Sequence, residues 1–146
     1  MAPRIYIVVY KGDPVDLQKT RHTALFIYDD DDNDDDDRGN GDILHVAGAA
    51  GLFVFERRHD ENPEKSRTFV RQFPVEPIIN SPTKQQLITE ITATPVNNST
   101  HSWNCQIWIG DALGRLVGAH WISTQTASNA ISSMAAVIVE AKDEEP

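Results

Sequence analysis

The sequence holds one cysteine, Cys105, and the residue types around it suggest nucleophilic chemistry. Cys105 follows Asn104 at the start of a stretch whose apolar residues recur at helical spacing, so the thiol is expected at a helix N-terminus. A thiolate is the nucleophile in cysteine chemistry, and a helix N-terminus or a nearby imidazole lowers the pKa of a thiol. Upstream, His22 and His45 each lie inside an apolar run of β-strand composition. The pattern predicts a reactive cysteine with histidine partners.

Nucleophilic catalysis by a cysteine needs an imidazole within hydrogen-bond reach and a third polar group that holds this imidazole in one tautomer. We expect Cys105 to attack an amide, ester or thioester and to form a thioester intermediate. His22 would accept the thiol proton and later protonate the leaving group, while His45 on the neighbouring strand would orient His22. Backbone N–H groups at the helix start would receive the oxyanion. This mechanism uses no cofactor.

The elements that must position these residues are five β-like runs followed by three helical stretches. The β-like runs span residues 4–10, 22–28, 42–48, 52–58 and 67–73. The helical stretches span residues 82–94, 104–117 and 123–141. Strands that follow one another through turns favour an antiparallel sheet, and the helices would cover one face of it. The sequence therefore predicts an α+β fold, an antiparallel sheet of about five strands followed by three helices.

Charge is concentrated in one segment. The chain of 146 residues has 22 Asp and Glu against 13 Lys and Arg, a formal net charge of −9, and eight of the aspartates lie between Asp29 and Asp37. Residues 29–41 are expected to form a solvated acidic loop within one domain, residues 1–141, with an acidic tail at 142–146. The calcium-loop pattern of an EF-hand is absent from this run. Because an acidic protein repels phosphate, neither nucleic acid nor an anionic membrane is an expected partner.

Cysteine usage and hydropathy indicate the compartment. One cysteine cannot form an internal disulfide, and neither a cleavable leader before Ile5 nor an apolar stretch of bilayer length is evident. We expect a cytoplasmic protein. A metal site is not expected either, since His101 lies four residues before Cys105 but no further ligand accompanies the pair, and His120 lies near a different helix end.

Three short motifs resemble those of the circularly permuted papain-like (NlpC-type) superfamily, in which the histidine strand precedes the cysteine helix. Residues 22–27, residues 43–46 and Asn104-Cys105-Gln106 are similar to the two histidine strands and the Asn-Cys helix of the lecithin:retinol acyltransferase family. His22-Thr23 and Asn104-Cys105 also resemble the PPPDE-type isopeptidases, which use a His/Cys dyad. The resemblance implies a permuted papain-like fold and a cysteine-dependent hydrolase or acyl transferase, acting on a small acyl substrate or on a peptide or isopeptide bond.

A non-catalytic role on the same fold is the alternative. Thr23 stands where the acyltransferase family usually has an aromatic residue, and Gln106-Ile107 replaces its usual Glu-His. These differences suggest a module that binds a ligand or a protein partner, with the acidic loop selecting basic surfaces. The oligomeric state is left open.

Overall fold

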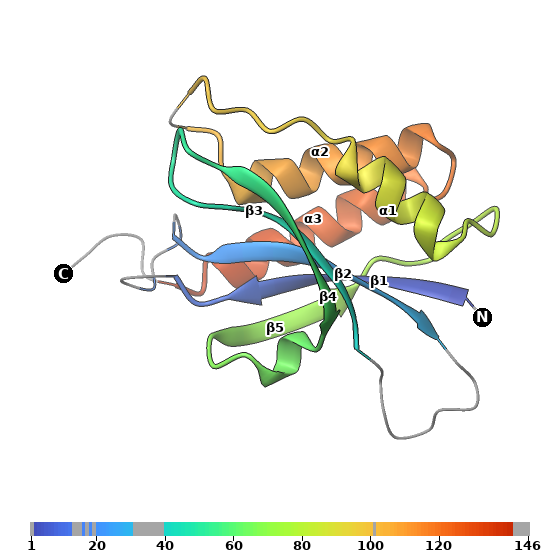
Figure 1. Cartoon of the computed structure of the whole chain (residues 1–146), viewed down its shortest axis with the longest axis horizontal. Coiled ribbons are helices and arrows are strands. Elements are labelled where there is room, and N and C mark those ends of the chain that lie inside the picture. Colours follow the sequence, from blue (N-terminus) through green and yellow to red (C-terminus); the bar gives the residue numbers. More distant parts are fainter. Residues whose placement is uncertain are drawn as a thin grey trace.

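The structure of the chain is a computed structural model that describes residues 2–12, 16, 18, 20–30, 40–100 and 102–141. Most of the predicted acidic loop (31–39), the acidic tail (142–146) and His101 lie outside the described residues. Five strands and three helices follow one another in the predicted order (Figure 1). The predicted α+β fold is confirmed.

The strands form one antiparallel sheet in the order β4-β3-β2-β1-β5. Their bounds are β1 (Ala2–Tyr10), β2 (His22–Asp30), β3 (Gly41–Ala47), β4 (Val54–Glu61) and β5 (Phe69–Pro74). β1 and β2 pair along their whole length, from Ala2 opposite Asp30 to Tyr10 opposite His22. A single turn of 3-10 helix, η1 (Pro63–Lys65), connects β4 to β5. His22 therefore lies at the end of the sheet where β1 finishes and β2 begins.

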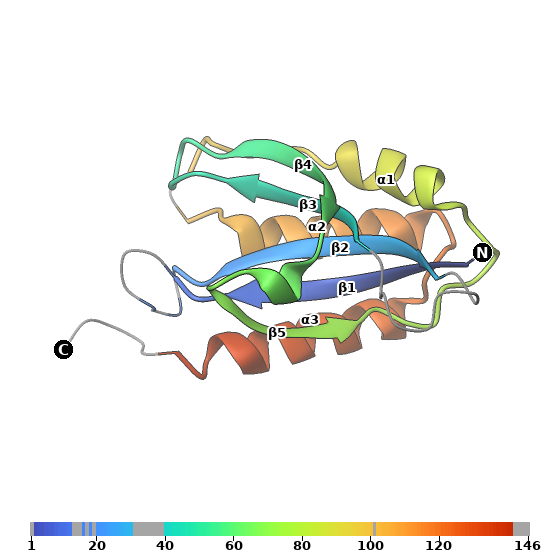
Figure 2. The same cartoon turned by 60° about the horizontal axis from the view of Figure 1, so that its bottom comes forward.

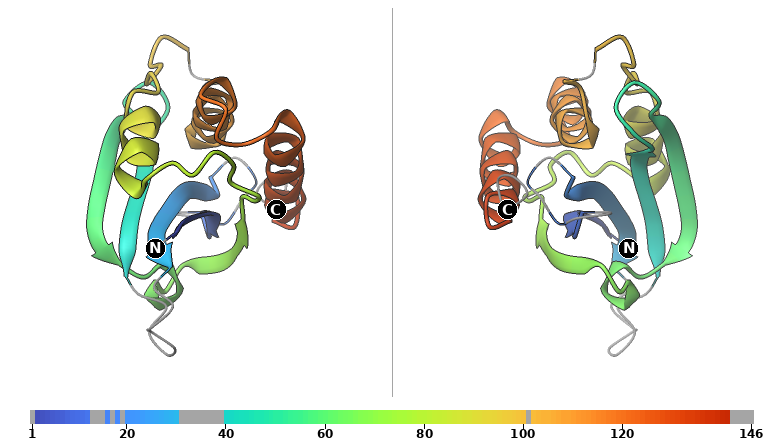
Figure 3. Two further views of the ribbon diagram at one scale, coloured as in Figure 1. Left: turned by 90° about the vertical axis from the view of Figure 1, so that its right-hand side faces the viewer. Right: turned by 90° about the vertical axis from the view of Figure 1, so that its left-hand side faces the viewer.

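The three helices pack on one face of the sheet, which curves around them (Figure 3). They are α1 (Lys84–Thr92), α2 (Cys105–Gly118) and α3 (Thr124–Ile138). Alternate strand residues point to this face and join the helices in the main core; among them are Ile5, Ile7, Leu25, Ile27, Leu44 and Val46. α2 contributes the fully buried Trp108, Ile109 and Leu113. α2 is the central helix of this layer, in contact with α1, α3, β2 and β3.

The opposite face of the sheet has a second, smaller core. It is built from the strand residues of the other parity, Val8, Ala24, Phe26 and Ile43, with aromatic side chains packed against them. Figure 2 shows the end of β4 and η1 crossing over this face on the way to β5. Side chains on β2 and β3 are therefore buried on both faces, and a residue and its neighbour in sequence enter different cores.

Candidate functional site

Cys105 is the first residue of α2, as predicted. Asn104 is the N-cap, and its side-chain oxygen accepts hydrogen bonds from the backbone N–H groups of Gln106 (3.0 Å) and Ile107 (3.1 Å). The cap satisfies two of the N–H groups that a helix start leaves without partners. Backbone N–H groups at this helix start were the expected donors to an oxyanion, and those of Gln106 and Ile107 are occupied by Asn104.

Loss of this cap has a testable cost. We expect Asn104→Ala to lower the free energy of unfolding by about 1 kcal/mol, because alanine cannot accept the two N–H bonds. Urea unfolding followed by circular dichroism measures the difference. Asn129→Ala, at an exposed position inside α3, is the matched control: it loses only the exposed bond from Gln125 and gains the better helix former, so it should change the free energy of unfolding by no more than about 0.5 kcal/mol. Equal losses in the two variants would contradict a capping role for Asn104.

The thiol of Cys105 is enclosed. The residue is 7% exposed, and its Sγ–H donates to the backbone carbonyl of Arg21 at 3.9 Å. Burial raises the pKa of the thiol above its ordinary value, and this effect outweighs the influence of the neighbouring Thr23 and of the helix-start N–H groups, which lowers the pKa. Cys105 is consequently a protonated thiol at neutral pH.

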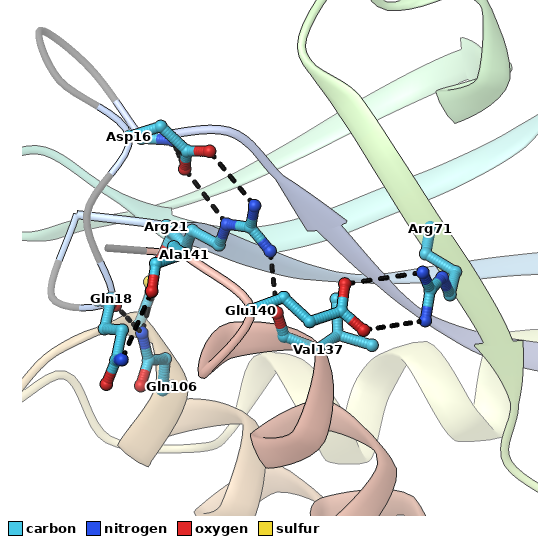
Figure 4. A network of polar contacts seen from close by, with 10 residues as sticks. Asp16, Gln18, Arg21, Arg71, Gln106, Val137, Glu140 and Ala141 are labelled. Atoms are coloured by element: carbon cyan, nitrogen blue, oxygen red, sulfur yellow. Dashed lines mark hydrogen bonds and ion pairs between the residues drawn. The ribbon is translucent and has the colours of Figure 1, made fainter. Parts of the chain in front are cut away.

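A polar network holds the segment before β2 over the start of α2 (Figure 4). Gln106 Nε2 donates to the carbonyls of Gln18 (3.1 Å) and Arg21 (3.4 Å), so Cys105 and Gln106 share the Arg21 carbonyl. The Arg21 guanidinium donates twice to the Asp16 carboxylate (2.9 and 3.0 Å) and once to the Val137 carbonyl at the end of α3 (2.6 Å). Gln106, which departs from the acyltransferase pattern, thus serves to fix α2 against the chain entering β2.

The two histidines meet, in a chain of hydrogen bonds with a carboxylate. His22 Nε2 lies 2.5 Å from His45 Nδ1, and His45 Nε2 lies 2.7 Å from Glu56 Oε1 on β4. The ring of Tyr10 stacks on the ring of His22, with the centroids 5.8 Å apart. Sequence analysis anticipated the pairing of His22 with His45. It missed Glu56, which lies opposite His45 in the register of β3 and β4.

The ionisation of Glu56 fixes the protons along this chain. Hydrogen bonds from His45 and Arg58 hold the pKa of Glu56 below its ordinary value, so the carboxylate accepts. Burial lowers the pKa of His45 despite the Glu56 hydrogen bond, so neutral His45 must carry its proton on Nε2 and accept at Nδ1. Burial, then the charges of His45 and Arg58, lower the pKa of His22 to about 4. Neutral His22 therefore donates from Nε2 to His45. The Nδ1 atom of His22 carries no proton and is left as a hydrogen-bond acceptor.

The structure does not bring the His22 imidazole to Cys105. Thr23 faces the sulfur, and because successive side chains of a strand point to opposite faces, His22 points to the other face, where Tyr10 stacks on it. No hydrogen bond joins Cys105 to an imidazole in the described part of the chain. The expected assembly, with His22 as the base for Cys105, is thus divided by the sheet, and only the His22 backbone comes near the sulfur.

The described residues contain no group of three or more His, Cys, Asp or Glu placed to hold a metal ion. His120 lies just beyond the end of α2, while Cys105 lies at its start. The aspartates considered for calcium lie mostly outside the described residues. Among the described helices, none is both long and apolar enough to cross a bilayer.

A cavity of about 620 Å³ lies at the other end of the sheet, where β1 begins and the chain runs from β5 to α1. In Figure 1 this end is on the right, and the starts of β2 and α2 are on the left. The lining of the cavity comes from three segments: residues 3–6, Asp29, and the connection from β5 to α1 (residues 74–78 and 81–84). Sequence analysis gave no sign of it, because the lining segments are distant in sequence and carry no motif.

The fold and site define an α+β protein in which a helix-start cysteine and a pair of strand histidines lie on opposite faces of one antiparallel sheet. Residues 5–123 match the model of a protein family of unknown function, DUF6540, and the chain belongs to that family. The comparison with curated proteins found no match, and neither did the comparison with solved structures.

Proposed function

We propose that this protein is a non-catalytic binding module that takes its ligand in the cavity at the start of β1. The observation that carries the proposal is the contrast between the two ends of the sheet. At one end Cys105 is 7% exposed, protonated and bonded to a carbonyl. At the other end a cavity of about 620 Å³, in the size range of small-molecule sites, is open and lined by both apolar and charged groups.

The enclosed thiol supports the non-catalytic half of this proposal. A cysteine nucleophile must be reachable and must have a base, whereas Cys105 has a raised pKa and no imidazole partner in the described structure. Cys105 instead packs with the main core as a small apolar side chain. Its hydrogen bond to Arg21 helps to fix the strand that carries His22.

Cysteine-dependent hydrolysis or acyl transfer is the second candidate, and two observations favour it. The order of a histidine strand followed by a cysteine helix packed on it agrees with the permuted papain-like arrangement. The Arg21 carbonyl at 3.9 Å from the sulfur also places the backbone of His22 next to the thiol. Catalysis would require the His22 side chain to turn through the end of β2 and to leave His45. An amide, ester or thioester substrate and a cytoplasmic location belong to this proposal.

Alkylation kinetics distinguish the two candidates. With iodoacetamide at pH 6 to 7 we expect the native thiol to react roughly tenfold or more slowly than the urea-unfolded thiol, because it is buried and protonated. His22→Asn should leave this slow rate unchanged. Rapid reaction below pH 7 that is lost in His22→Asn would contradict the binding proposal and support catalysis. Cys105→Ala is the blank for labelling elsewhere.

The binding half is tested by a ligand screen on the full chain. A set of small cationic, anionic and neutral compounds is titrated with detection by NMR. Ile78→Trp, designed to fill the cavity from its wall, is the control. Binding of any of the three charge classes to the wild type, with loss in Ile78→Trp, would support the proposal. Absence of binding in all three classes would overturn it.

A further inference from the structure

The cavity at the start of β1 has rigid walls. Four of the chain's eight prolines line it: Pro3, Pro74, Pro77 and Pro82. The proline ring fixes φ, so these backbone segments lose little freedom when a ligand enters. Ile78, which is half-buried, supplies apolar surface between them, over the buried side chains of Ile5 and Val75. The cavity is thus suited to a ligand with a compact apolar body.

Two carboxylates line this cavity without an ion-pair partner among the described residues. Lys84 lines it, but its Nζ lies 3.0 Å from Asp42 and is held in that ion pair. Arg4 has an interaction of its own. Asp29 and Glu76 also line the cavity, and in the described part of the chain neither forms an ion pair. Two carboxylates are therefore available to a ligand, and the net charge of −9 adds an attractive field for cations.

The edge of β1 at this cavity is a poor place for a peptide strand. Val75 N–H donates to the Ile5 carbonyl at 2.8 Å, after which the chain leaves β1. Pro3, two residues before Ile5 on the same edge, has no N–H to donate to an added strand. A peptide that added to this edge of β1 beyond Val75 would find no N–H donor at Pro3. A small molecule is therefore a better candidate ligand than an extended peptide.

We propose that this cavity binds a small organic ammonium ion with an apolar body. Asp29 and Glu76 would accept hydrogen bonds from the ammonium group, and the proline rings and Ile78 would contact the body. The half-buried ring of Tyr6, stacked on Tyr28 with the centroids 6.0 Å apart, also lines the cavity and adds aromatic surface to it. This ligand class rests on the proposed binding function and specifies it.

Three probes that share one apolar body test the ligand class. Cyclohexylmethylamine is the cation, cyclohexanecarboxylate the anion and cyclohexylmethanol the neutral compound. Each is titrated into the full chain at low salt, with NMR shifts recorded. We expect the amine to bind at least about tenfold more tightly than the other two, and added salt to weaken it. The double variant Asp29→Asn with Glu76→Gln should lose about tenfold in affinity for the amine.

Glu90→Gln is the matched control, because Glu90 lies on α1, is paired with Arg115 and does not line the cavity. It should bind the amine as the wild type does. Binding of the alcohol or the acid in the cavity at least as tightly as the amine, or full affinity in the double variant, would overturn the ammonium proposal and leave the binding function standing. Binding of none of the three would overturn both.

Discussion

Acidification from pH 6.5 to about 4 is expected to reduce the free energy of unfolding by roughly 3 kcal/mol through His22 alone. Burial, then the charges of His45 and Arg58, lower the pKa of folded His22 from 6.5 to about 4. Between these two pH values the unfolded chain binds more protons than the folded chain, so the contribution of His22 is complete above pH 6.5 and is lost as the pH falls. Burial of His45 also lowers its pKa, so its contribution has the same sign.

The measurement is urea unfolding at pH values from 7.5 to 4, compared between the wild type and His22→Gln. Glutamine can donate to His45 but does not titrate, so the stability of the variant should depend less steeply on pH. The difference between the free energies of unfolding of the wild type and the variant cancels the effect of carboxylates. Their pKa values are lowered, so they act over a more acidic range. His120→Asn is the control, since His120 is exposed and asparagine tolerates its positive φ of 65°. Parallel stability curves for the wild type and His22→Gln would contradict the buried neutral histidine.

The second large effect is expected at Asp42. Its side chain is almost fully buried, yet three cationic or potentially cationic groups contact its two oxygens: Arg57 Nε at 2.5 Å, Lys84 Nζ at 3.0 Å and His59 Nδ1 at 3.2 Å. Burial alone would raise the pKa of Asp42, but hydrogen bonds from Arg57 and Lys84 hold it below its ordinary value. The carboxylate joins β3 to β4 and to the first residue of α1.

We expect Asp42→Ala to cost about 3–5 kcal/mol, because removal of one partner leaves the others without compensation for their charge. Asp42→Asn keeps the shape and should cost less. Asp111→Ala, at an exposed position on α2, should change the free energy of unfolding by no more than about 0.5 kcal/mol. The three variants are compared by urea unfolding at pH 7. An Asp42→Ala variant as stable as Asp111→Ala would show that the cluster has no structural role.

The elements of this fold were predictable because each has a clear local signal. The β-branched run before Tyr10 predicted β1, and apolar spacing of three and four predicted α2 and its start at Cys105. The first and last residues of the elements were predicted less accurately. Pro82 was expected to begin the first helix, whereas Thr83 is the N-cap, because its side chain and that of Gln86 exchange hydrogen bonds with each other's backbone.

The face of the sheet to which the His22 side chain points was not predictable from the sequence. In β2 both parities are apolar: Leu25 and Ile27 pack under the helices, and Ala24 and Phe26 pack in the second core. Alternation assigns a side chain to a face only where one face is polar, so the pattern of this strand is compatible with His22 on either side. The cavity was equally inaccessible to sequence reasoning, since it forms where three separate segments meet.

The bond from Arg21 to the Val137 carbonyl has a consequence for synthesis on the ribosome. Arg21 precedes the second strand, and Val137 lies in the last turn of the last helix, 116 positions later. Until that turn has left the exit tunnel, a guanidinium that is 7% exposed in the finished fold lacks one of its acceptors. The polar network before β2 is therefore complete only once the end of α3 has been made. Chains cut short before residue 137 would lack this acceptor and should be recognised by chaperones and proteases as unfinished.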